Sequence, residues 1–131
     1  MATRSRIGKL NDDGTVTSIY CHSDGYPEYV GRILYKHWDH PTMVETLISL
    51  GDISCLGDTR EDTIDYRSWG ETAVEPITHK ANDWPSTWTE WRYLYVPSRD
   101  GWMVQSVDEE TGTQWTKLGE YLKTVKIFSE E

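Results

Sequence analysis

The sequence of 131 residues is short of several features that would assign it to a class. It has two cysteines, Cys21 and Cys55, which are too few for a disulfide scaffold, so we expect both thiols to be free in a reducing compartment. Thirteen Lys and Arg stand against twenty-two Asp and Glu, for a net charge of −9. Because a nonspecific grip on nucleic acid needs a basic face, we expect no direct nucleic-acid binding.

Long apolar runs are also missing. No stretch is long enough to span a bilayer, and no apolar segment follows the first six residues, so neither a membrane partner nor a signal peptide is expected. Phenylalanine occurs once, against seven Trp and eight Tyr. These rings have polar edges and suit half-exposed faces, which predicts a shallow, aromatic-rich core. The length of the chain predicts a single domain over residues 1–131.

The hydrophobic pattern predicts an α+β fold. A strong hairpin signal, Asp13-Gly14, separates two strand-like segments at residues 4–10 and 15–21. Both faces of the second segment carry apolar groups, so we expect it to be covered on both sides. Residues 87–96 alternate around aromatic side chains and turn into residues 102–107, which predicts a second hairpin.

Two short helices are expected between the hairpins. Apolar side chains at helical spacing indicate one helix over residues 28–38, which ends before Pro41. Thr42 followed by Glu45 is a capping-box pattern for a second helix that stops at Gly51. The predicted architecture is an antiparallel sheet of two β-hairpins with a packed α-hairpin on one face. Residues 115–128 fit either a short strand or a helix.

Residues 52–85 lack periodicity and are predicted to form an acidic irregular segment. Such a segment is a candidate surface for binding another protein. A second acidic stretch, residues 108–110, is expected to add to this surface. The candidate partner-binding residues are Asp58, Glu61, Asp62, Asp65, Glu71, Asp108, Glu109 and Glu110.

Groups capable of chemistry gather at a strand-to-helix joint in residues 18–31, where a turn at Asp24 precedes Pro27. Cys21 and His22 are neighbours on a strand, so their side chains should diverge rather than pair as nucleophile and base. Asp24 is expected to cap the turn. No zinc-ligand set, phosphate-binding glycine loop or serine-hydrolase signature is present, so we predict no metal, no cofactor and no enzymatic activity. A hydrolase that uses Asp24 or His22 is also considered, in addition to the two binding functions given below.

Two blocks of the sequence resemble a family of small bacteriophage proteins whose members read SRIG…DG…SIYCHWDGYP…VG, then LIALGDISSLG. The matching residues are 4–8, 13–14, 18–22, 24–27, 30–31 and 47–57, and the aromatic residues at 93–95, 101–102 and 115 are similar to that family's ending. The chain departs from the family at Ser23, usually Trp, and at Cys55, usually Ser. The resemblance implies a phage accessory protein in the cytoplasm of an infected host cell, where small acidic phage proteins often disarm defences, as anti-CRISPR proteins do.

Two functions follow as hypotheses. In the first, the acidic residues bind a basic, nucleic-acid-binding surface of a host defence protein and occlude it. In the alternative, the chain is a binding module that sequesters a nucleotide second messenger, with arginines on phosphate and rings on a base. The residues of this alternative ligand-binding site are Arg4, Arg6, Tyr20, His22, Asp24, Tyr26 and Trp91. The oligomeric state is left open.

Overall fold

Eight strands form one mixed sheet in the computed structural model, which describes residues 3–65, 74–81, 83–85, 89–97, 101–107 and 115–124. The order is β4-β3-β2-β1-β6-β7-β8, and β5 also pairs with β2. The strands are β1 (Ser5–Leu10), β2 (Thr15–Cys21), β3 (Ile53–Cys55), β4 (Ile64–Asp65), β5 (Ile77–Lys80), β6 (Trp91–Val96), β7 (Gly101–Ser106) and β8 (Thr116–Lys117). The helical elements are the π-helical η1 (Pro27–Gly31), α1 (Arg32–His37), α2 (Pro41–Ser49) and α3 (Leu118–Thr124).

The α+β class and the two predicted hairpins are confirmed, because β1 pairs antiparallel with β2 and β6 with β7. The expectation of a purely antiparallel sheet is wrong. The hairpins are joined by a parallel pairing of β1 with β6, and β2 is parallel to β3 at its end. Parallel neighbours need a long crossover between them, which η1, α1 and α2 supply between β2 and β3.

Three short strands lie inside residues 52–85, so this segment is not irregular throughout. β3, β4 and β5 are each two to four residues long. The second edge of β2 is divided between two of them: β5 pairs with residues 15–18, and β3 pairs at Cys21. Strands this short carry too little alternation for a sequence pattern to reveal them.

The first predicted helix is present as η1 followed by α1, with Pro27 at the first helical position. The second helix begins earlier than expected, at Pro41. Its N-cap is His40, whose Nδ1 accepts the Thr42 N–H at 3.3 Å, so the capping box predicted for Thr42 and Glu45 is wrong. The stop at Gly51 is confirmed, because Gly51 has a φ of +78° and its N–H donates to the Ile48 carbonyl.

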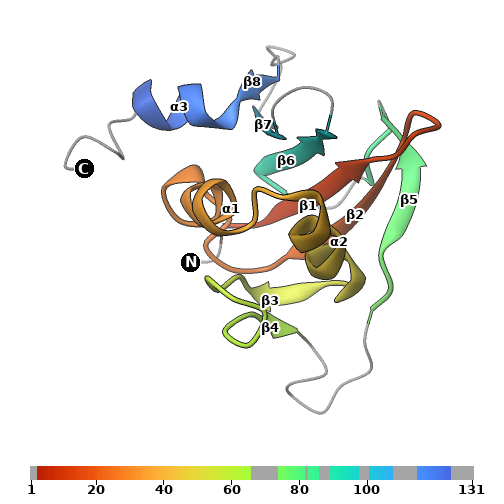
Figure 1. Cartoon of the computed structure of the whole chain (residues 1–131), viewed down its shortest axis with the longest axis horizontal. Coiled ribbons are helices and arrows are strands. Elements are labelled where there is room, and N and C mark those ends of the chain that lie inside the picture. Colours follow the sequence, from red (N-terminus) through yellow and green to blue (C-terminus); the bar gives the residue numbers. More distant parts are fainter. Residues whose placement is uncertain are drawn as a thin grey trace.

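Both faces of the sheet are covered, as the two-sided pattern of β2 predicted. Figure 1 shows α1 and α2 on one side of β1 and β2, with α3 beside α1. The core on this helix side includes Ile7, Ile19, Cys21, Leu34, Trp38, Leu47, Tyr93, Tyr95, Trp102 and Leu122. A smaller core on the opposite face contains Val16, Trp84, Leu94, Val96 and Met103. The segment 115–124 contains both of its alternatives, since β8 leads directly into α3.

Gly14 and Gly51 both have a positive φ, but only Gly51 is tightly packed. Substitutions at the two positions therefore distinguish the cost of backbone strain from the cost of a steric clash. Gly14 has a φ of +89° and open space around an added Cβ, whereas a Cβ on Gly51 would collide with the Val74 carbonyl oxygen. Gly14→Ala should therefore cost about 1–2 kcal/mol of unfolding free energy, which is the strain of the left-handed region alone. Gly51→Ala should cost clearly more. Urea denaturation of both variants checks this, and equal losses would contradict the tight fit at Gly51.

Candidate functional site

The connection between β3 and β4 carries three of the predicted partner-binding residues at the surface. Asp58, Glu61 and Asp62, here named the acidic turn, are all exposed. Asp58 Oδ2 lies 3.6 Å from Nε2 of His37, at the end of α1. Asp65 is a correction: it lies in β4 opposite Ile53 and is only 7% exposed, so it does not belong to this surface. Glu71, Asp108, Glu109 and Glu110 lie outside the described residues.

Threonine hydroxyl groups build the acidic turn. Thr63 Oγ1 donates to the Thr59 carbonyl at 2.8 Å and accepts the Gly57 N–H at 3.0 Å. Thr59 Oγ1 accepts the Asp62 N–H at 3.2 Å. These hydroxyl groups satisfy backbone groups of the turn and fix its shape, and its three acidic residues are exposed.

Positive and negative side chains are distributed unequally between surface and interior. Among the described residues, the exposed carboxylates are Asp12, Asp13, Glu28, Asp39, Glu45, Asp58, Glu61, Asp62, Glu75, Asp83, Glu90 and Glu120. The exposed basic side chains there are Lys36, Arg60, Lys80, Lys117 and Lys123. The remaining described arginines and lysines are half-buried or buried, so the described surface is predominantly negative.

Three arginines share the sheet face that the helices do not cover. Arg6 lies opposite Tyr20 on β2 and beside Arg92 on β6, and Arg4 precedes Arg6 by two residues; these three form the arginine face. Like charges on directly opposed strand positions repel each other. Burial lowers the pKa of Arg6 and of Arg92, although the nearby Asp52 carboxylate acts against the lowering at Arg6.

Internal contacts occupy much of this face. Arg6 is only 2% exposed and donates to Ser18 twice, from Nε to Oγ at 3.0 Å and from Nη2 to the carbonyl at 3.1 Å. Arg92 donates to Gln105 Oε1 at 3.0 Å and lies over the Trp84 ring, 5.4 Å from its centroid. The guanidinium of Arg6 is therefore occupied by hydrogen bonds within the protein and is not available to bind a phosphate group.

The structure brings together only part of the predicted nucleotide site. Tyr20 and His22 lie near the arginine face, with the Tyr20 hydroxyl 3.0 Å from Nδ1 of His22. Trp91 was expected in the same site but does not join it, because its ring packs edge-on against Tyr121 on the helix side of the sheet. Asp24 adopts a φ of +55° in the joint, and Tyr26 precedes η1 with 37% of its surface exposed.

The predicted divergence of Cys21 and His22 is confirmed. Cys21 is fully buried in the helix-side core, while His22 contacts Tyr20. Burial raises the pKa of the Cys21 thiol to about 12, which leaves very little thiolate at neutral pH. Within the described part of the chain, no three His, Cys, Asp or Glu side chains are grouped to hold a metal ion. No helix in that part is long and apolar enough to cross a membrane.

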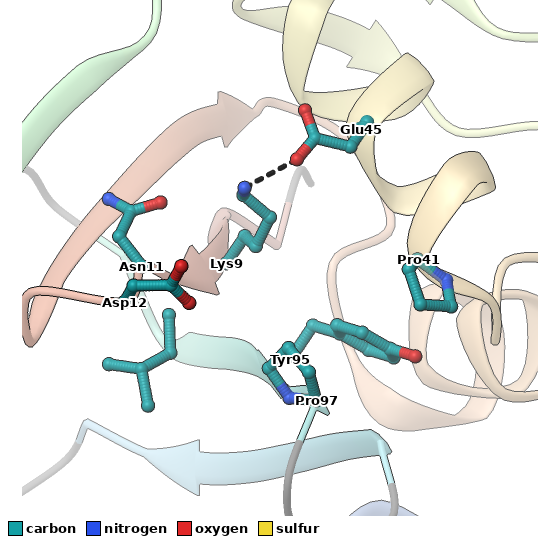
Figure 2. Close-up of a pocket in the computed structure, with 8 residues that line it drawn as sticks. Lys9, Asn11, Asp12, Pro41, Glu45, Tyr95 and Pro97 are labelled. Atoms are coloured by element: carbon teal, nitrogen blue, oxygen red, sulfur yellow. Dashed lines mark hydrogen bonds and ion pairs between the residues drawn. The ribbon is translucent and has the colours of Figure 1, made fainter.

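A polar hollow of about 350 Å³, which no sequence pattern predicted, opens where β1, β6 and α2 meet. Figure 2 shows Asn11 and Asp12 on one wall, Pro41 and Glu45 on the other, and Tyr95 with Pro97 beneath them. The Lys9 ammonium lies 2.5 Å from Glu45 Oε2. The lining residues are Lys9, Leu10, Asn11, Asp12, Pro41, Glu45, Tyr95 and Pro97.

No family model, no curated protein and no solved structure matches this chain.

The two thiols should differ sharply in reactivity. With iodoacetamide at neutral pH, the half-buried Cys55 should be alkylated in the folded protein, whereas Cys21 should react only after denaturation. Mass spectrometry of peptides from native and unfolded samples measures this. Equal labelling of both residues in the native state would show that the Cys21 site opens readily.

Proposed function

We propose that this protein is a non-enzymatic inhibitor, a phage accessory protein of the anti-defence kind, which binds a basic surface of a host defence protein and occludes its nucleic-acid site. One observation carries the proposal: among the described residues most carboxylates are exposed, whereas every arginine except Arg60 is half-buried or buried. A surface of this kind is complementary to the positive groove that nucleic-acid-binding proteins present. The sequence resemblance to small bacteriophage proteins supports the phage origin in this proposal, and the anti-defence role is an analogy with other small acidic phage proteins.

The acidic turn is the part of this surface that we assign to the partner. Its carboxylates are exposed, clustered within five residues and held on a turn fixed by Thr59 and Thr63. Exposed charges act mainly through steering, so association should be fast at low salt and should weaken as salt is added. This salt dependence distinguishes charge-driven capture from hydrophobic docking.

Affinity capture from host lysate, followed by mass spectrometry, tests the proposal. The chain should retain a nucleic-acid-binding protein at low ionic strength, and that protein should lose its nucleic acid when the chain is added. A triple reversal, Asp58→Lys, Glu61→Lys and Asp62→Lys, should weaken capture by about tenfold or more, equivalent to about 1.4 kcal/mol.

A second triple variant provides the matched control. Glu75→Lys, Asp83→Lys and Glu120→Lys change the net charge by the same amount at exposed positions outside the acidic turn. Capture should survive these substitutions largely intact. If both triple variants lose binding equally, the acidic turn is not the contact, and if low salt yields no nucleic-acid-binding partner, the inhibitor proposal fails.

One observation favours the second candidate, a module that sequesters a nucleotide second messenger. Arg4 Nε is buried and has no hydrogen-bond partner among the described residues, and Arg4 shares its face with Tyr20 and Arg92. A buried donor without a partner is costly unless a ligand completes it. A phosphate oxygen is a suitable acceptor for that group.

Thermal unfolding with a panel of cyclic mono- and dinucleotides tests this candidate. A ligand that binds only the folded chain should raise the Tm by several degrees, and Arg4→Gln should remove the shift. Arg60→Gln, an exposed arginine on the acidic turn, is the matched control and should retain it. No shift with any nucleotide would reject the candidate.

A further inference from the structure

The polar hollow has the lining of a site for a basic side chain. We propose that it binds the guanidinium group of an arginine, supplied by the protein partner. The identity of that partner rests on the proposed function, whereas the chemistry of the hollow does not. The hollow shares no lining residue with the acidic turn or the arginine face. It would give the partner a specific pocket for one side chain, in addition to the general attraction of the negative surface.

One wall of the hollow presents hydrogen-bond acceptors. The Asp12 carboxylate is exposed and accepts no hydrogen bond from the described residues, whereas the neighbouring Asp13 is engaged by the hydroxyl and the N–H of Thr15. Asn11 donates through Nδ2 to Thr15 and Thr17 at 3.1 and 3.0 Å, which fixes the orientation of its amide. Figure 2 shows the amide oxygen turned toward the side of Lys9.

The charge of the hollow is negative. Lys9 is paired with Glu45 through one carboxylate oxygen, and the Asp12 carboxylate remains uncompensated within the lining. The lining thus carries two carboxylates and one ammonium group. A guanidinium has five N–H donors in a planar fork and no acceptor, which matches a wall made of acceptors.

The start of α2 borders the hollow but offers little to an anion. Pro41 has no N–H, and the Thr42 N–H donates to His40 Nδ1 at 3.3 Å. The Val44 N–H donates to the His40 carbonyl at 2.9 Å. The donors that usually bind phosphate at a helix N-terminus are therefore largely absent or occupied.

The remaining walls are apolar and suit the methylene stem of an arginine. Tyr95 lies beneath the opening, its ring packed edge-on against Trp102 with centroids 5.3 Å apart, and Pro41 and Pro97 flank it. An aromatic face attracts a cation placed over it, and long basic side chains lay their stems along apolar surfaces. A volume near the lower end of the roughly 300–1,000 Å³ typical of ligand pockets fits one side chain.

The hollow and the acidic turn adjoin the same connection between helices. His37, at the end of α1, contacts Asp58 in the acidic turn, and Pro41, at the start of α2, lines the hollow. These two residues are four positions apart, so their Cα atoms are separated by no more than about 14 Å. One basic partner surface can therefore span both features.

Titration of the ¹⁵N-labelled protein with N-acetyl-arginine amide, followed by amide chemical shifts, tests the assignment. Shifts should concentrate at Leu10, Asn11, Asp12, Thr42 and Tyr95. The citrulline analogue, a neutral isostere, should leave these resonances unchanged. Asp12→Asn should weaken arginine binding by about fivefold or more, because it removes the free carboxylate.

Asp13→Asn is the matched control, since it removes the same charge one residue away from a carboxylate already engaged with Thr15. It should retain affinity within about twofold. Equal losses in the two variants, equal shifts with citrulline, or shifts outside the hollow would overturn the assignment. If the hollow fails while partner capture persists, only this inference falls; if arginine binds but no basic partner is captured, only the proposed function falls.

Discussion

The parallel pairing of β1 with β6 is the constraint on which both faces of the molecule depend. Its register runs from Ser5 beside Trp91 to Lys9 beside Tyr95. Because side chains alternate along a strand, this register places Lys9 and Tyr95 together under α2 and forces Arg6 next to Arg92 on the opposite face. A shift by one residue would remove the floor of the hollow and separate the arginines at once.

Placing Arg6 beside Arg92 costs free energy through charge repulsion, and contacts within the protein offset that cost. Arg6 gives two hydrogen bonds to Ser18, Arg92 lies on the Trp84 ring, and the Asp52 carboxylate provides counter-charge near Arg6. Buried charges are tolerated only when they are bonded in this way. The functional consequence is indirect: basic groups used inside cannot neutralise the carboxylates outside, so the protein presents a more negative surface than a uniform distribution of its charges would give.

The sequence was informative where a signal is local. The Asp13-Gly14 hairpin, the stop at Gly51 and the divergence of Cys21 and His22 each follow from a few neighbouring residues, and each is confirmed. The pairing of β1 with β6 joins segments 86 positions apart, and no periodicity reports such a partner. Trp91 shows the same limit, because alternation separates the two faces of β6 but does not say which face meets the helices.

Glu45 shows how one such distant contact decides the chemistry of a site. If this carboxylate capped its own helix, as the local pattern predicted, Lys9 would reach into the hollow without a partner. The lining would then hold one ammonium group, Lys9, and one carboxylate, Asp12, so it would carry no net charge and would no longer favour a cation. In the structure His40 caps α2 and Glu45 is free to pair with Lys9, 36 positions earlier. The charge of the ligand that the hollow favours therefore depends on the contact between Lys9 in β1 and Glu45 in α2, which are brought together only when the sheet is complete.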